Sequence, residues 1–270
     1  MNALFAIYRF ELKRVLTTGR TFWWFVVVAF PPTIIFLINQ FSQLPPGFQE
    51  AEKDFIFTGV LYFLAPSVSC MLGALLMSAP AIANELEQHS WVYLATRPNG
   101  MFHLLLGKFG VSVTWASTAT IAGIVLSSLL GPFVSPVTTI VQMSCLALLS
   151  AMAYSALYLM IGTLFHARAM VFCVAYTAAV ELFLGLLPAV INRMTMQFRL
   201  RSILYHWVEI PESAPREIKQ SWEESLSQVA LQESQALQVL WLVSFSVVFI
   251  AIALVCVQVR EFTTARESEL

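Results

Sequence analysis

The sequence predicts an all-α membrane protein with six transmembrane helices, preceded by an "elbow" helix that lies in the membrane interface. Of its 270 residues, 58% are hydrophobic and only 11% are charged, whereas about 25% of the residues of a soluble domain are charged. The apolar residues gather in runs long enough to cross about 30 Å of hydrocarbon. We therefore treat residues 1–270 as a single transmembrane domain. A formal net charge of -1 argues against nucleic-acid binding.

The elbow helix is predicted over residues 2–20, which form an amphipathic segment before the first apolar run. Its apolar face holds Leu4, Tyr8, Leu12, Val15 and Leu16. Its basic face holds Arg9, Lys13 and Arg14. This pattern is typical of a helix in the plane of the interface with its cations toward headgroups. The alternative is an ordinary cytoplasmic helix.

Six apolar runs follow, and each is expected to be a span. They cover about 21–41, 55–83, 104–130, 137–165, 169–191 and 236–259. Pro31 and Pro32 predict a kink in the first span, and Pro66 and Pro80 punctuate the second.

The third span carries a ridge of small residues at four-residue spacing. It consists of Ala119, Gly123, Ser127 and Gly131. Such a ridge lets helices approach closely, either within the subunit or at a dimer contact.

The distribution of Lys and Arg orients these spans. With the N-terminus inside, nine Lys and Arg residues are cytoplasmic and six are external, and positive residues favour the cytoplasm. We therefore expect both termini, the loop 84–104 and the link 166–168 in the cytoplasm, and the segment 192–235 outside. A helical stripe from Met196 to Trp207 predicts a short helix that rests on the outer leaflet, caps a pathway, or is a solvated helix without function.

The sequence lacks the common catalytic patterns. Gly107-Lys108 has no glycine five residues before it, so it is no phosphate-binding P-loop. The four histidines show no metal-ligand spacing, and the four cysteines lie in apolar runs, where we expect them to be buried thiols. We expect no enzyme activity, cofactor or metal in this chain.

Glu181 is the one clear acid inside a predicted span. A carboxylate at that depth costs about 2.5–3.5 kcal/mol on insertion scales, so it should face the bundle interior or a watery cavity. It is either a pathway or ion-coupling group, or a structural acid bonded to Ser, Thr or Tyr on another span.

The polar insert between the second and third spans carries the strongest functional pattern. It reads Glu85-x-Glu87, then Ser90-Trp91-Val92-Tyr93-Leu94, Arg97-Pro98 and Leu105-Leu106-Gly107-Lys108. The insert resembles the first cytoplasmic loop of the type-2 family of ABC transporter permeases, the membrane subunits of ATP-driven exporters. The elbow helix with its Arg-x-x-x-Lys-Arg pattern, the six spans and the long outer segment are similar to that family as well.

The resemblance implies that two permeases, as a homodimer or with a similar partner, join two cytoplasmic ATPase subunits that bind ATP and Mg. The loop 84–104 would then hold the coupling helix. Glu85 and Glu87 would accept hydrogen bonds from basic groups of the ATPase. Trp91 and Tyr93 are rigid anchors of the kind found in binding hot spots. Arg97 before Pro98 favours extended backbone and should end the helix.

By the same analogy, the substrate route lies between the two permeases, with Glu181, Pro31 and Pro32 near it. The sequence thus predicts the permease subunit of an ABC exporter in the cell (cytoplasmic) membrane. One alternative is an ATPase-coupled membrane assembly or regulatory protein that moves no solute. Another is a stand-alone secondary transporter, which would predict inverted repeats and several buried charges.

Overall fold

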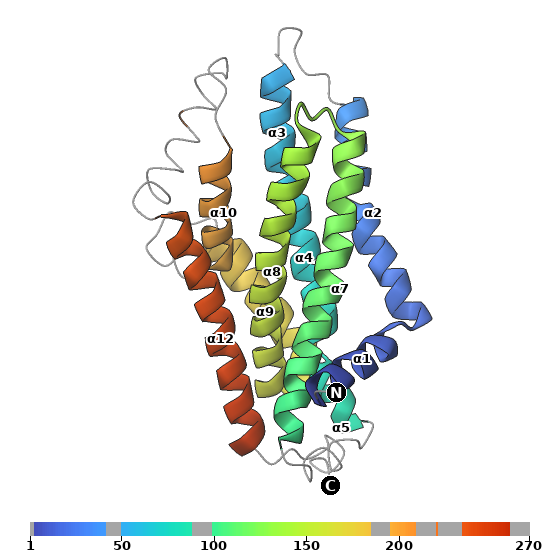
Figure 1. The fold of residues 1–270 in the computed structure, drawn as a ribbon, viewed down its shortest axis with the longest axis vertical. Helices are drawn as coiled ribbons and strands as arrows, with labels where there is room; N and C mark the ends of the chain where they lie inside the picture. Colours follow the sequence, from blue (N-terminus) through green and yellow to red (C-terminus); the bar gives the residue numbers. More distant parts are fainter. Residues whose placement is uncertain are drawn as a thin grey trace.

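The computed structural model describes residues 3–41, 50–87, 99–184, 195–208, 220 and 234–259, and all regular structure among them is helical (Figure 1). Five helices within these ranges are long and apolar enough to cross a membrane. They are Thr18–Phe41, Glu50–Glu87, Gly100–Leu130, Pro136–Leu164 and Gln235–Val259. The chain is therefore a helical membrane protein.

The amphipathic N-terminal segment forms α1 (Ala3–Val15), which lies across the lower end of the bundle and packs on α7 (Figure 1). The backbone N–H of Thr17 donates to the carbonyl of Val15 at 2.7 Å, and this tight turn ends α1. The next helix, α2 (Thr18–Phe41), begins directly afterwards. The helix predicted over residues 2–20 therefore ends early, because the chain turns upward before Thr18.

The first span is helical through its proline pair. Pro31 and Pro32 are both buried inside α2. A Cβ placed on Gly123 of α7 would lie 3.1 Å from the Val28 carbonyl and 3.4 Å from the Pro31 ring. Gly123 therefore lets α2 and α7 approach closely, so this part of the small-residue ridge serves packing within the subunit.

The second span consists of four consecutive helical segments. It contains α3 (Glu50–Tyr62), the π-helix η1 (Phe63–Ser69), α4 (Cys70–Ser78) and α5 (Ala81–Glu87). Pro66, which has no backbone N–H, lies in η1, and the Ser150 hydroxyl donates to the Pro66 carbonyl at 2.6 Å. A turn at Ala79 and Pro80 separates α4 from α5. Both prolines interrupt the α-helix, as the sequence predicts.

The centre of the bundle is formed by α7 (Gly100–Leu130) and α8 (Pro136–Leu164), joined by a short link at the upper end (Figure 1). Tyr154 and Tyr158 of α8 are fully buried. A Cβ on Gly162 would lie 2.5 Å from the Ala79 carbonyl oxygen, so α8 presses on the turn between α4 and α5. The last span, α12 (Gln235–Val259), runs beside α8.

The fifth predicted span is helical from Ala169 to Leu184, as α9 (Ala169–Tyr176) followed by the π-helix η3 (Thr177–Leu184). It follows the 3-10 turn η2 (His166–Arg168). The remainder of this span, residues 185–191, lies outside the described residues. It is therefore not among the five spans that the described residues contain.

The helix predicted from Met196 to Trp207 is present as α10. It stands beside α12 and α8 rather than across the end of the bundle (Figure 1). Most of its first nine residues are buried, including Gln197 and Arg199. The Arg199 guanidinium donates to the Gln238 side-chain oxygen at 2.8 Å and lies over the Trp241 ring. These partners let the polar side of α10 face α12.

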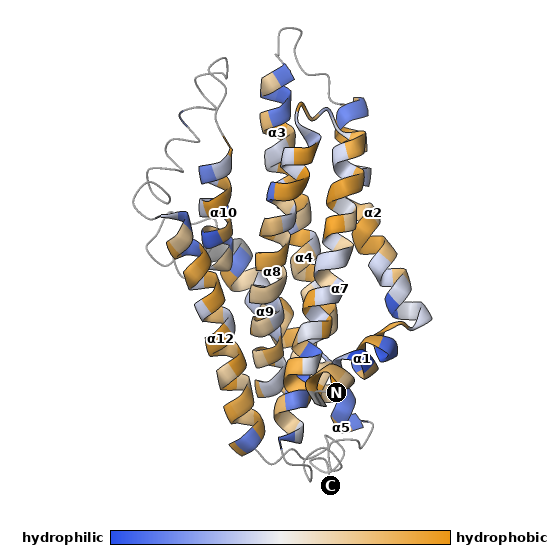
Figure 2. Cartoon of the chain, viewed as in Figure 1, coloured by the Kyte–Doolittle hydropathy of each residue, from blue (hydrophilic) through white to orange (hydrophobic). Residues whose placement is uncertain are grey.

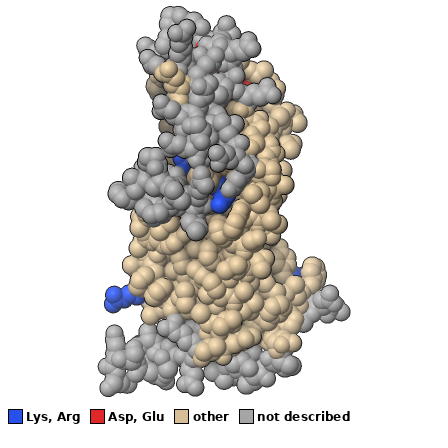
Figure 3. Space-filling view, turned by 90° about the vertical axis from the view of Figure 1, so that its left-hand side faces the viewer, with Lys and Arg blue, Asp and Glu red and all other residues tan. Residues whose placement is uncertain are grey.

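The surface of the bundle has the polarity expected of a membrane protein. Apolar residues cover the long helices, while hydrophilic residues gather on α1, α5 and the upper end of α3 (Figure 2). One face shows a broad uncharged band above the basic side chains of the lower end (Figure 3). Large apolar side chains such as Phe25, Val141 and Val247 are at least 58% exposed. This band matches what a helix bundle presents to lipid.

Candidate functional site

The predicted coupling segment is bracketed by α5 and α7. Trp91, Tyr93, Arg97 and Pro98 fall within residues 88–98, which lie outside the described residues. Asn99 caps α7 with a left-handed backbone (φ 57°), a conformation that Asn tolerates better than most residues. Its carbonyl accepts a hydrogen bond from the His103 N–H at 3.1 Å. The chain therefore turns into α7 at Asn99 and Gly100, directly after the Arg97-Pro98 pair at which the sequence predicts that the coupling helix ends.

Glu85 lies at the centre of a buried ion cluster at the lower end of the bundle. Its carboxylate is 2.6 Å from the Arg14 guanidinium of α1 and 2.7 Å from the Lys108 ammonium of α7. Glu11 of α1 completes the cluster, 3.2 Å from Lys108 and 3.5 Å from Arg14. We call Glu11, Arg14, Glu85 and Lys108 the inner ion cluster. It connects α1, α5 and α7.

The cluster changes the interpretation of Glu85. The sequence predicts that Glu85 accepts hydrogen bonds from a partner ATPase. In the structure, however, Glu85 is only 1% exposed, and its carboxylate already binds Arg14 and Lys108 of the same chain. Glu87, by contrast, is exposed at the end of α5. Two paired cations allow α5 to continue the second span past Ala83. Glu85 thus holds together α1, α5 and α7, and the last two of these helices flank the predicted coupling segment.

Sequence reasoning did not identify Glu11, Arg14 and Lys108 as partners of Glu85. The sequence did indicate that these residues could meet, because the predicted topology places all four of them at the same end of the bundle. Opposite charges at a similar membrane depth tend to pair, since an unpaired buried charge is costly. Depth alone, however, does not select which cation binds which acid.

The second candidate site surrounds Glu181, in η3. Glu181 is buried, with only 3% of its surface exposed. The Tyr154 hydroxyl donates to one carboxylate oxygen at 3.0 Å. The backbone N–H groups of Met196 and Gln197 donate to the two oxygens at 3.2 and 3.1 Å. Glu181 therefore binds the N-terminus of α10, where free N–H groups and the helix dipole favour an acid.

Further polar side chains surround this acid. The Tyr62 hydroxyl donates to the Gln197 side-chain oxygen at 3.3 Å, and the hydroxyls of Tyr158 and Thr177 are 2.6 Å apart. The rings of Tyr154 and Tyr158 stack with centroids 5.8 Å apart. Tyr154 lies on the fourth span, so these are the hydrogen bonds expected of a structural acid. A role of Glu181 in a pathway stays a prediction.

Pro31 and Pro32 do not share the immediate surroundings of Glu181. Pro31 faces Gly123 on α7, whereas the hydrogen-bond partners of Glu181 come from α8 and α10. Sequence reasoning grouped these residues by analogy, and the structure brings together only Glu181 and its tyrosines.

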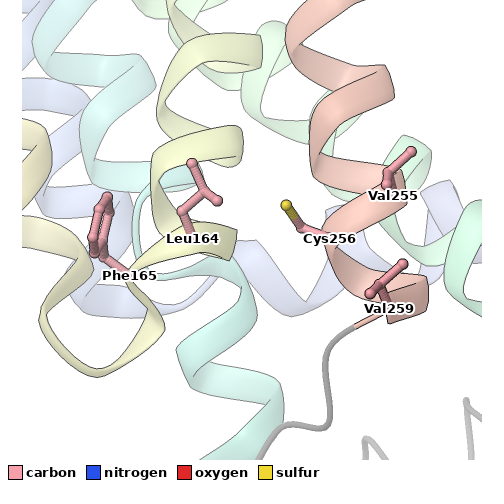
Figure 4. A pocket seen from close by; sticks show the side chains of 5 residues that line it. All are labelled: Leu164, Phe165, Val255, Cys256 and Val259. Carbon is pink, nitrogen blue, oxygen red and sulfur yellow. The ribbon is translucent and has the colours of Figure 1, made fainter.

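An apolar pocket of about 450 Å³ lies between the C-terminal ends of α8 and α12 (Figure 4). It is lined by Leu164, Phe165, Val255, Cys256 and Val259. The lining can accommodate hydrocarbon but carries no charged group. Among the described residues, no group of three or more His, Cys, Asp or Glu side chains could hold a metal ion.

Compared with models of known families and with curated proteins, the sequence matches none of them.

Proposed function

We propose that this chain is the transmembrane permease subunit of an ABC transporter that exports its substrate across the cytoplasmic membrane. ATP would be hydrolysed by separate cytoplasmic ATPase subunits. The observation that best supports this function is the inner ion cluster, because it joins α1 to α5 and α7, the two helices that flank residues 88–98. A force applied to that segment by an ATPase would move α5 and α7 together with α1.

Six spans are part of the proposal. In Figure 1, α8 and α12 both descend from the upper to the lower end, so the chain between them has to cross back. The helical stretch α9–η3 begins at the lower end and rises toward α10 (Figure 1). We assign it as the fifth span, which puts both termini on one side, the cytoplasmic side by the positive-inside rule.

The elbow role of α1 is supported by its exposed apolar side chains. Phe5 and Phe10 are 55% and 65% exposed on a helix that lies across the bundle end. Such side chains gain free energy when they enter the headgroup boundary. Movement of α1 would then reach α2, which contains Pro31 and Pro32 and follows after a two-residue turn.

The proposed partners are two ABC ATPase subunits and a second permease copy, identical or similar. Trp91, Tyr93, Arg97 and Pro98 remain the proposed contacts with the ATPase, together with exposed Glu87. A direct test is to isolate the full chain from cell membranes in mild detergent and identify bound proteins by mass spectrometry. We expect an ABC ATPase to be retained by the wild type and lost from the Trp91→Ala/Tyr93→Ala variant. Equal ATPase recovery from both proteins would contradict the proposed docking segment.

The side of the membrane is tested by cysteine labelling in a variant lacking the four native cysteines. Trp91→Cys should react with a membrane-impermeant maleimide only after the cells are opened. Val134→Cys, exposed at the opposite end of the bundle, should react in intact cells. The reverse pattern would place the loop 84–104 outside and exclude the proposal.

The buried Glu181 supports a second candidate, a secondary transporter that works alone. A carboxyl group inside a span, surrounded by hydroxyl groups, is a common site of proton coupling. This candidate predicts solute flux driven by a proton gradient in vesicles that contain neither ATP nor an ATPase. The permease proposal predicts flux only when ATP and the ATPase are both present.

A further inference from the structure

We propose that the pocket between α1, the start of α2, α5 and α7 binds the phosphate group of an anionic phospholipid. The pocket has a volume of about 250 Å³. It is lined by Glu11, Arg14, Thr17, Arg20, Asn84 and Lys108. None of these lining residues belongs to the Glu181 site, and the proposal does not depend on the transport function.

The charges around this pocket favour an anion. Among the described residues, Arg14, Arg20 and Lys108 supply three cations, while Glu11 and Glu85 supply two carboxylates, which leaves one surplus positive charge. Arg14 and Lys108 are the cations that bind the carboxylates. The surplus charge therefore belongs to Arg20.

Arg20 is partly buried, and its guanidinium makes no ion pair or hydrogen bond within the described part of the chain. The Thr17 hydroxyl and the Asn84 amide also line the pocket without a side-chain hydrogen bond to another described residue. Guanidinium, hydroxyl and amide groups are the donors that bind phosphate oxygens, and Arg can do so through two parallel bonds. The pocket thus offers a positive charge together with hydrogen-bond donors that no described residue occupies.

The surroundings of the pocket identify a lipid as the source of the phosphate. At the corner between α1 and α2, the side chains of Leu16, Phe22 and Trp23 are 69%, 63% and 51% exposed. A ligand with its phosphate at Arg20 would have apolar surface directly beside it for acyl chains. A small soluble phosphate compound would make no use of these features.

The proposal is tested on the purified full-length chain in neutral detergent. Phosphatidylglycerol and phosphatidylcholine with the same acyl chains are titrated into the micelles, and binding is followed by native mass spectrometry. We expect tighter binding of phosphatidylglycerol, and a loss of about fivefold in its affinity for Arg20→Gln, the change expected for one cation near an anionic surface. Lys13→Gln, which removes the same charge from an exposed position on α1, should bind phosphatidylglycerol within twofold of the wild type.

Two further measurements test whether the lipid itself is the ligand. Arg20→Lys keeps the charge and should retain the preference for phosphatidylglycerol, which separates ligand binding from a folding defect. Glycerol phosphate at millimolar concentration should not displace the lipid. Equal binding of the two lipids, equal losses in Arg20→Gln and Lys13→Gln, or glycerol phosphate binding as tightly as the lipid would each overturn the proposal.

Discussion

Replacing Glu85 with Gln should destabilise the inner end of the bundle by about 3 kcal/mol. Breaking a buried ion pair by removing one partner costs roughly 3–5 kcal/mol, because the remaining charge is left without compensation. Here Lys108, with 9% of its side chain exposed, would keep only the longer contact of 3.2 Å with Glu11. Arg14, with 27% of its side chain exposed, can recover part of its hydration. We therefore expect a value at the lower end of that range.

The assay is reversible unfolding in mixed detergent micelles, followed by circular dichroism for the wild type and each variant. Glu87→Gln is the matched control, because Glu87 is an exposed acid on the same helix, and it should leave the free energy of unfolding unchanged. The double variant Glu85→Gln/Lys108→Gln should be less destabilised than the sum of the single variants, since the two side chains interact directly. If Glu85→Gln behaves like Glu87→Gln, the inner ion cluster does not hold α5 to α1 and α7.

Three further predictions concern the interior. Glu181→Gln should leave folding and ATPase association intact but reduce ATP-dependent flux if the acid serves the pathway; unchanged flux would leave it with a structural role only. Tyr154→Phe should lower the free energy of unfolding by about 1.5 kcal/mol, because it removes a 3.0 Å hydrogen bond to a carboxyl group, and an unchanged value would show that this bond does not contribute. Gly162→Ala should destabilise the bundle by about 1–3 kcal/mol, because its Cβ would lie 2.5 Å from the Ala79 carbonyl oxygen. Gly59→Ala, where a Cβ would meet nothing within 4 Å, is the matched control and should cost nothing.

The helices themselves could be predicted from the sequence because apolar length and proline positions determine them strongly. The structure gives α7, α8 and α12 within a few residues of the predicted spans, and it places the interruptions of the second span at Pro66 and Pro80. The residues at which the spans end were less predictable. The second span continues to Glu87, because the charge of Glu85 is neutralised by residues that are distant in the sequence.

The candidate sites were predictable only in part. Glu181 stood out because an acid in an apolar run is unusual, and a tyrosine on another span was an expected partner. Its contact with the N-terminus of α10 was not expected, because α10 was predicted to rest on the outer leaflet, to cap a pathway or to be a solvated helix, and none of these alternatives named Glu181 as a partner. Periodicity shows that a helix has two faces, but it does not show which neighbours cover them.

The π-helix η1 determines the orientation of residues far from it in the second span. A π-helix advances by a smaller rotation per residue than an α-helix, so rewinding Phe63–Ser69 as ordinary α-helix would rotate the rest of the second span by roughly 100°. Glu85 would then swing away from Arg14 and Lys108. The angular setting of α5 at the lower end of the molecule is thus fixed by backbone winding around Pro66, deep within the same span.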